Sequence, residues 1–440
     1  MDKKIPEIIL NTMFEYDGFG CFCAKDIENV APDEPPKTTL KLYNDMSKTL
    51  RFAYSAKTGL NLTGKAGGVI EQNILGKILA LPNGNIDKHI EFFETYGFLL
   101  PLSCDEFESV DAVTLLEVVN RIKATIRLMN AIGKKNYKKM LIHATYLLYS
   151  PVMHINTTEV QYETCRHKFS TLLENYNYFP DLGSVPEVFV KGTYSVQDTM
   201  IGEKNPIDIE FYNAVRSGAD TKVPGSKDSR FKHIMAMYTG CQDEDEETRT
   251  LIDFYYHFQT EVSVIEDVCF NSIKLYSHTD ETTFSDNIKL ALVRIARIVV
   301  AEEINHNIQG IHPKYDGSKL TATWQVDTLI QAIYFSIFYM KAGVEIYKEC
   351  ENPNCKRDKY FLVKTTRGNK RYCCEQCRGA ASSQRHRNRT YNNKQKNKAP
   401  PSFSEGRAFR YIVGCGIVPL VSTFSIASAN NRFCCSGIVM

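Results

Sequence analysis

Apolar residues recur at intervals of three and four positions through most of the first 349 residues. This spacing places them on one side of an α-helix. One such stripe consists of Leu290, Leu292, Ile295, Ile298 and Val299, and another of Leu329, Ile333, Ile337 and Met340. The pattern predicts helices over residues 40–57, 68–81, 86–98, 108–134, 137–149, 245–276, 284–309 and 323–349. Because these stripes must bury against one another, we predict a mainly α protein with a multi-helix bundle as its body.

Loops rich in Gly, Pro, Asp and Lys interrupt this pattern at residues 31–37, 179–206 and 217–228. The second of them could divide the predicted body, residues 1–345, into two lobes. Strand-like segments such as residues 188–190 are too few to predict a large sheet. With 43% hydrophobic and 24% charged residues, the chain has the composition of a globular protein.

A separate module is predicted at residues 346–398, where two groups of cysteines lie about seventeen residues apart. Cys350 and Cys355 flank three turn-forming residues, and the second group contains Cys373, Cys374 and Cys377. Four thiolates from two such turns bind Zn²⁺ tetrahedrally, and the ion replaces the core that a short module lacks. We predict Cys350, Cys355, Cys373 and Cys377 as the ligands, with Cys374 as the alternative to Cys373.

The residues between the cysteine groups predict a β-hairpin. Residues 360–363 have the composition of a strand, residues 367–370 that of a turn, and residues 371–372 that of the returning strand. A helix is predicted to follow from Glu375. The expected arrangement is a small treble-clef-like zinc module.

The sequences CENPNC, KYFLV, RYCCEQC and RHRNR resemble the CGNR-type zinc finger of bacterial proteins thought to be transcription regulators. The resemblance covers about forty residues, and the four predicted ligands fall on the family's four ligand positions. It implies a bound zinc ion and a role in regulating transcription. The family's Cys-Gly-Asn-Arg tetrad is here Cys377-Arg378-Gly379-Ala380, and the second knuckle is one residue shorter.

Charge is distributed very unevenly along the chain. Residues 350–398 contain 14 Lys and Arg against 3 Asp and Glu, whereas residues 1–349 contain 36 against 47. On a helix from Glu375, Arg378, Arg385, Arg389 and Lys396 fall within about 20° of one line, and Arg387 lies nearly opposite. A helix that is basic on all sides suits phosphate neutralisation. We predict that this chain binds nucleic acid, most simply double-stranded DNA, through these five residues.

Other functions remain open at this point. The zinc module could instead bind an acidic protein partner as an adaptor, and the acidic body could sense a signal or form a homodimer. An enzyme with a pocket in the body is a further alternative, but we predict no catalytic residue. The segment Gly59–Ala66 resembles a phosphate-binding loop but lacks its final hydroxyl. Glu302, Glu303 and His306 have a single Glu-x-x-His spacing, which we interpret as a solvated helical face.

The amino-terminal residues contain no long apolar stretch, so we predict a cytoplasmic protein whose fourteen cysteines are reduced. The tail, residues 399–440, is uncharged from Tyr411 to Asn431 and is long enough to span a bilayer as a helix. Gly414, Gly416 and Pro419 disfavour such a helix. A tail anchor, a packed segment and a poorly ordered tail are all left open.

Overall fold

The computed structural model describes residues 12–28, 37–56, 59–64, 69–71, 73–169, 245–263, 265–275, 279, 281–317, 320–341, 344–355 and 359–396. The chain divides into two compact units, Met1–Gln384 and Arg385–Met440. The predicted loops at 179–206 and 217–228, most of the loop at 31–37, and the tail at 399–440 lie outside the described residues. Whether residues 1–345 and 346–398 are separate domains stays a prediction.

A five-stranded antiparallel sheet forms the amino-terminal part of the first unit. Two long strands, β1 (Thr12–Glu28) and β2 (Lys37–Ser55), pair along their length. The other edge of β2 pairs at one end with β5 (Glu108–Asp111) and at the other end with β3 (Gly59–Thr63). The short strand β4 (Val69–Glu71) then pairs with β3. The resemblance of Gly59–Ala66 to a phosphate-binding loop is therefore misleading, since most of it is a buried strand.

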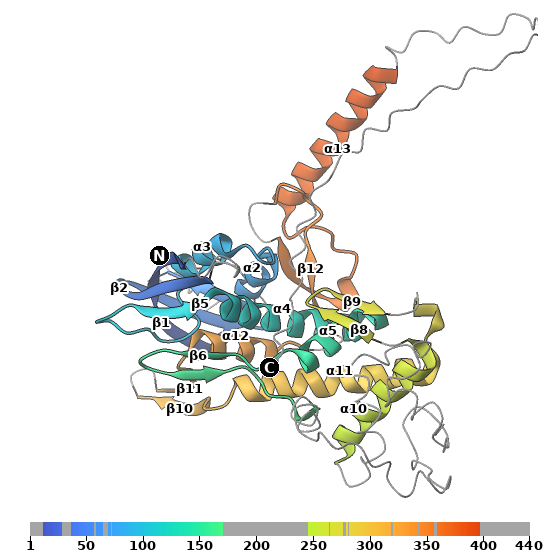
Figure 1. The fold of residues 1–440 in the computed structure, drawn as a ribbon. Helices are drawn as coiled ribbons and strands as arrows, with labels where there is room; N and C mark the ends of the chain where they lie inside the picture. The colour runs from blue at the N-terminus through green and yellow to red at the C-terminus, as the bar shows by residue number, and fades with distance from the viewer. Residues whose placement is uncertain are drawn as a thin grey trace, which may run out of the picture. The chain divides into compact units, whose positions relative to one another are not determined.

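Helices make up the second layer of this unit. They are α2 (Ile74–Ala80), α3 (Ile86–Tyr96), α4 (Ala112–Lys134), α5 (Tyr137–Tyr149), α10 (Glu246–His257), α11 (Asp286–Asn307) and α12 (Leu329–Phe338). Polar residues define where they begin: Asn85, Asp111, Asn136, Ser285 and Thr328 each accept a backbone N–H bond of the first turn. Helices α4, α5 and α11 pack against one another (Figure 1).

The described residues also include four short hairpins. They are β6 (His154–Asn156) with β7 (Gln161–Glu163), β8 (Ile265–Cys269) with β9 (Ser272–Leu275), β10 (His312–Asp316) with β11 (Thr321–Gln325), and β12 (Glu345–Glu349) with β13 (Tyr360–Lys364). A π-helical turn, Phe258–Val262, continues α10. The last helix, α13 (Glu375–Lys396), follows β13.

The prediction of a mainly α fold is wrong, because strands are present throughout the first unit. The predicted helix at 40–57 is strand β2, where Leu40 and Leu42 are buried and the Lys between them is exposed. Alternation with a period of two is the signature of a half-buried strand. The carboxyl-terminal half of the predicted helix 245–276, and both ends of 323–349, are likewise hairpin strands.

The sheet and the helices share one hydrophobic core. Phe14 of β1 contacts Phe335 of α12, with 4.8 Å between the ring centroids. Gly97, which follows α3, has a φ of 82°, and a Cβ there would lie 2.5 Å from the carbonyl oxygen of Phe19. Only glycine allows α3 to end so close to β1.

Candidate metal centre

The first two cysteines lie on the connection between β12 and β13. The Cys350 backbone N–H donates to the Lys359 carbonyl at 2.6 Å and so continues the hairpin beyond its last strand pair. Asn352 then forms the turn: its carbonyl accepts from the Cys355 N–H at 3.0 Å, and its side chain accepts from the Asn354 N–H at 3.2 Å. The asparagines therefore fold the chain so that both sulfur atoms face one point.

The second pair of cysteines lies where α13 begins, and it completes a group of four. The Sγ atoms are 3.7 Å apart for Cys355 and Cys373, 3.5 Å for Cys373 and Cys377, and 3.6 Å for Cys377 and Cys355. Together with Cys350, all four sulfur atoms lie within 4.8 Å of one another. These distances exclude disulfides, whose sulfur atoms are about 2.05 Å apart. Sulfur ligands about 2.3 Å from a tetrahedral ion lie about 3.8 Å from each other, so the cluster could hold a metal ion.

The structure brings Cys373 into this cluster and leaves Cys374 outside it. The Cys374 sulfur lies 3.7 Å from that of Cys373 but does not belong to the group of four. The Cys374 carbonyl accepts the Arg378 N–H at 3.1 Å. Cys374 thus takes part in the first turn of α13 through its backbone.

Burial makes the thiols of Cys373 and Cys377 weaker acids. It raises the pKa of Cys377 to about 11 and, together with the neighbouring sulfur atoms, raises that of Cys373 even more. Thiolates at these positions therefore need a compensating positive charge. A metal ion would supply that charge and displace the thiol protons.

Two asparagines of the body bind the hairpin that carries Cys350. Asn130 of α4 accepts from the Tyr347 N–H at 2.8 Å and donates to the Tyr347 carbonyl at 3.2 Å. Asn73, which caps α2, donates to the Tyr360 carbonyl at 2.9 Å. These bonds satisfy outward-facing backbone groups of Tyr347 and Tyr360, so the hairpin that carries Cys350 is held against α4 and α2.

The predicted hairpin between the cysteine groups has the wrong partner strand. Strand β13 is present, but it pairs with β12, which precedes Cys350, and not with residues 371–372. Residues 365–367 form a 3₁₀ turn, and the turn predicted at 367–370 is present, because the Lys370 N–H donates to the Arg367 carbonyl at 3.0 Å. Strand β12 was not predicted, because the helical spacing of apolar residues over 323–349 assigned its residues to a helix.

The predicted basic helix is α13, which begins at Glu375. Cys377 and Ala381 are buried in its first turns, whereas the arginines predicted to bind nucleic acid are exposed, namely Arg378, Arg385, Arg387 and Arg389. Arg378 pairs with Glu375 at 2.5 Å. Lys396 is the last residue of the helix, and its side chain lies outside the described part.

A buried polar cluster on α11 escaped the sequence analysis. Glu303 is fully buried rather than solvated, and it accepts from Arg121 at 2.5 Å and contacts His167 Nε2 at 3.0 Å. Burial opposes ionisation, but Arg121 and His167 lower the pKa of Glu303 to about 2. The signal was available: Glu303 continues the stripe of Ile295 and Val299, and a carboxylate on a buried stripe requires partners.

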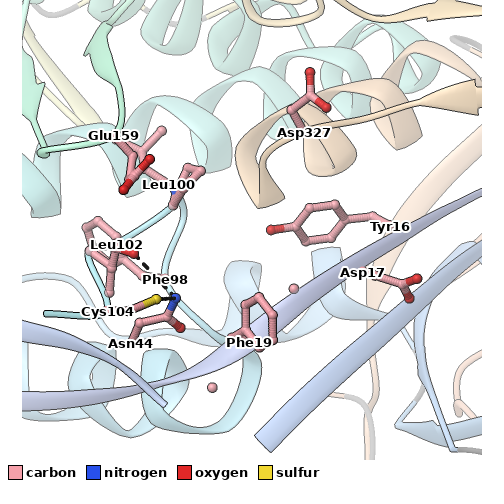
Figure 2. A pocket seen from close by; sticks show the side chains of 13 residues that line it. Tyr16, Asp17, Phe19, Asn44, Phe98, Leu100, Leu102, Cys104, Glu159 and Asp327 are labelled. Atoms are coloured by element: carbon pink, nitrogen blue, oxygen red, sulfur yellow. Dashed lines mark hydrogen bonds between the residues drawn. The ribbon is translucent and has the colours of Figure 1, made fainter. Parts of the chain in front are cut away.

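A pocket of about 320 Å³ lies beside the sheet, and none of the four clustered cysteines lines it. Its lining includes Asp17, Glu159 and Asp327, which surround it in Figure 2, and contains no Lys, Arg or His. It therefore offers neither a phosphate-binding cation nor a cysteine–histidine pair. The Cys104 sulfur in its wall instead accepts a bond from Asn44 at 3.7 Å.

Comparisons with protein-family models, with curated proteins and with solved structures found no match. The resemblance to the CGNR-type zinc finger therefore stays a prediction from the residues that carry it. Among the helices that the structure describes, none has the length and apolarity needed to cross a membrane. The segment considered as a tail anchor lies outside those residues.

Proposed function

We propose that this chain is a zinc-dependent nucleic-acid-binding protein that regulates transcription by binding double-stranded DNA through α13. The observation that carries the proposal is the position of Cys377, which belongs to both the four-cysteine cluster and the first turn of the basic helix. An ion at the cluster would fix the start of that helix. The exposed arginines beyond it would then be presented together.

Zinc is the metal that best suits the donor set. Four thiolates in tetrahedral arrangement favour Zn²⁺ or an iron centre over Ca²⁺ or Mg²⁺, which prefer oxygen ligands. All four ligand positions are taken by protein sulfur atoms, which is the pattern of a structural site. The role of the ion in this proposal is to fold the segment from Cys350 to Cys377.

Double-stranded DNA is supported by the charge and exposure of α13. Its described arginines are exposed on opposite sides of the helix, and few of its side chains are buried. Such a helix gains little from packing and much from releasing counterions condensed on phosphates. Phosphate contacts of this kind give affinity without selecting a sequence.

The first prediction concerns binding of the full-length, zinc-loaded protein to a duplex, measured by fluorescence anisotropy over a range of salt concentrations. We expect affinity to fall steeply with salt. Replacing Arg387 and Arg389 with Gln should reduce the slope of log K against log salt by about 2, because each removes about one phosphate contact. The matched control is Arg297→Gln, an exposed arginine on α11, which should leave the slope unchanged.

Two cysteine variants connect this binding to the metal. Cys350→Ser should lower the zinc content measured by mass spectrometry and weaken DNA binding, whereas Cys374→Ser should change neither. Equal binding by the Cys350→Ser protein, or affinity that is independent of salt in the intact protein, would contradict the proposal. Salt-dependent binding to an acidic peptide but not to DNA would favour an adaptor instead.

A further inference from the structure

The buried cluster on α11 contains a sulfur, a nitrogen and an oxygen donor that converge. The donor atoms of Cys165, His167 and Glu303 all lie within 4.8 Å of one another. At most 4% of each of these residues is exposed. Cys165 and His167 come from the segment after β7, and Glu303 comes from α11, so the three are joined only by the fold.

We propose that Cys165, His167 and Glu303 form a second metal site, which takes a divalent ion of the zinc type. Thiolate, imidazole and carboxylate are the three donor types that bind Zn²⁺ in proteins. Three protein ligands leave the fourth position of a tetrahedral ion open, as in catalytic rather than structural zinc sites. The site is thus different in kind from the four-cysteine cluster.

The surroundings of His167 match those of a metal ligand. Its Nδ1 lies 2.6 Å from Glu302 Oε2, while its Nε2 faces Glu303 at 3.0 Å. A ligating histidine usually donates its second ring N–H to a carboxylate, which fixes the ring and strengthens the ligand. Glu302 and Glu303 are consecutive on α11, so one serves as the orienting carboxylate and the other as a ligand.

The hydrogen bonds of Glu303 are also those of a ligating carboxylate. Arg121 donates to its Oε1 at 2.5 Å, and the Tyr334 hydroxyl donates to its Oε2 at 3.2 Å. These two bonds fix the orientation of the carboxylate. Ligands fixed in this way bind a metal with little loss of conformational freedom.

Arg121 gives a second and independent indication of a ligand. Only 1% of this residue is exposed, yet its Nε and Nη1 have no acceptor in the part of the chain that the structure describes. Buried N–H donors are nearly always paired. A water or a carboxylate bound with the ion would be an oxygen acceptor of the kind that these donors lack.

The charges around the cluster accommodate a divalent ion. Without metal, the Glu303 carboxylate pairs with the Arg121 guanidinium and contacts His167 Nε2. The Glu302 carboxylate contacts His167 Nδ1, so both ring nitrogens have a partner. The ion carries the same charge as the two protons it displaces, one from the Cys165 thiol and one from the His167 ring. Metal binding therefore leaves no uncompensated charge in the core.

The test is the zinc content of the full-length protein after equilibrium dialysis against micromolar Zn²⁺. We expect two equivalents in the wild-type protein and one in Cys165→Ala. Cys104→Ala, which removes an exposed thiol, is the matched control and should retain two. Cys165→Ala is the preferred variant because Arg121 binds only the backbone carbonyl of Cys165, at 2.7 Å, so the ion pairs remain.

Two further measurements distinguish the loss of this site from the loss of the four-cysteine site and from a folding defect. Cys350→Ser should retain the equivalent that Cys165→Ala loses, so failure of one site is distinguishable from failure of the other. Loss of a buried thiol lowers the unfolding temperature of Cys165→Ala by itself, so the readout is the increase on adding zinc, which should be larger in wild type than in Cys165→Ala. If Cys165→Ala binds as much zinc as wild type, the cluster is a metal-free ion network and the proposal is wrong.

Discussion

Single charged residues in the core determine much of the local architecture. Arg121, Lys123 and Glu303 are each at most 1% exposed, and each has partners that offset the loss of water. Arg121 and Glu303 neutralise each other at 2.5 Å. Lys123 has no such ion pair among the residues that the structure describes: its ammonium donates to the Leu81 carbonyl and to Asn83, both at 2.9 Å.

Lys123 leads to a prediction about pH. Burial, together with the positive charge of Arg127, lowers its pKa to about 7, against about 10.4 in the unfolded chain. Between these values the unfolded chain binds a proton that the folded chain does not, so stability rises with pH, by at most about 1.4 kcal/mol per unit. Urea unfolding at pH 6.5 and pH 9.5 should show this rise in wild type and a smaller one in Lys123→Met.

The control for Lys123→Met is a variant that removes an exposed lysine. Lys37→Met removes an exposed ammonium from the start of β2 and should leave the difference between the two pH values unchanged. His89, whose pKa is also lowered by burial, is common to all three proteins and cancels. An identical pH dependence in Lys123→Met and wild type would show that Lys123 does not titrate as described.

At the scale of elements, the hairpin of β12 and β13 combines two functions. Its connecting segment carries Cys350 and Cys355, while its strands are fixed to α4 and α2 by Asn130 and Asn73. The metal centre is therefore positioned by body helices as well as by its own turns.

Close packing of α2 on β13 leads to a prediction at this scale. A Cβ on Gly76 would lie 2.4 Å from the Tyr360 carbonyl oxygen, so Gly76→Ala must separate the two elements. We expect a loss of about 1–3 kcal/mol in the free energy of unfolding, as for other overpacked sites. Urea denaturation of the zinc-loaded protein measures it.

Gly379→Ala on α13 is the appropriate comparison, because nothing lies within 4 Å of a Cβ there. Alanine has a higher helix propensity than glycine, so this variant should be as stable as wild type or slightly more stable. Equal stability of the two variants would mean that α2 and β13 do not approach as closely as described.

The elements also show what local sequence could predict. The helix prediction at 137–149 is confirmed residue for residue in α5, and α3 and α11 lie within their predicted ranges. Each of these helices begins at a capping residue, so its signal is local. Strand β2 was missed because Leu40 and Leu42 satisfy a period of two only over short stretches, and because its place in the sheet depends on pairing with other segments, including the distant β5.

At the scale of the whole molecule, a body with excess acidic charge is followed by a strongly basic segment. The four-cysteine cluster lies at the transition, between hairpin β12–β13 and helix α13. Under the proposed function, this arrangement would confine attraction to polyanions to one part of the chain.

Removal of metal tests how far the first unit depends on the cluster. After treatment with a chelator, we expect faster amide hydrogen exchange in β12 and β13 and at Cys355, because the turns would lose the ion that we propose joins them. The buried stripe of α11 should keep its protection. Unchanged exchange in β13 after the zinc has been removed would contradict this expectation.

The sequence by itself determined the elements whose signals are local: the capped amphipathic helices, the asparagine turn with its cysteines, and the basic helix. The tertiary structure decided the rest, because the information lies in contacts between distant residues. The structure is a mixed fold of helices and sheets where a helix bundle was predicted, and β13 pairs with β12. Cys373 belongs to the four-cysteine cluster, whereas its neighbour Cys374 does not. The tertiary structure also brought Cys165 and His167 to Glu303, across more than a hundred residues, a proximity that no local pattern predicts.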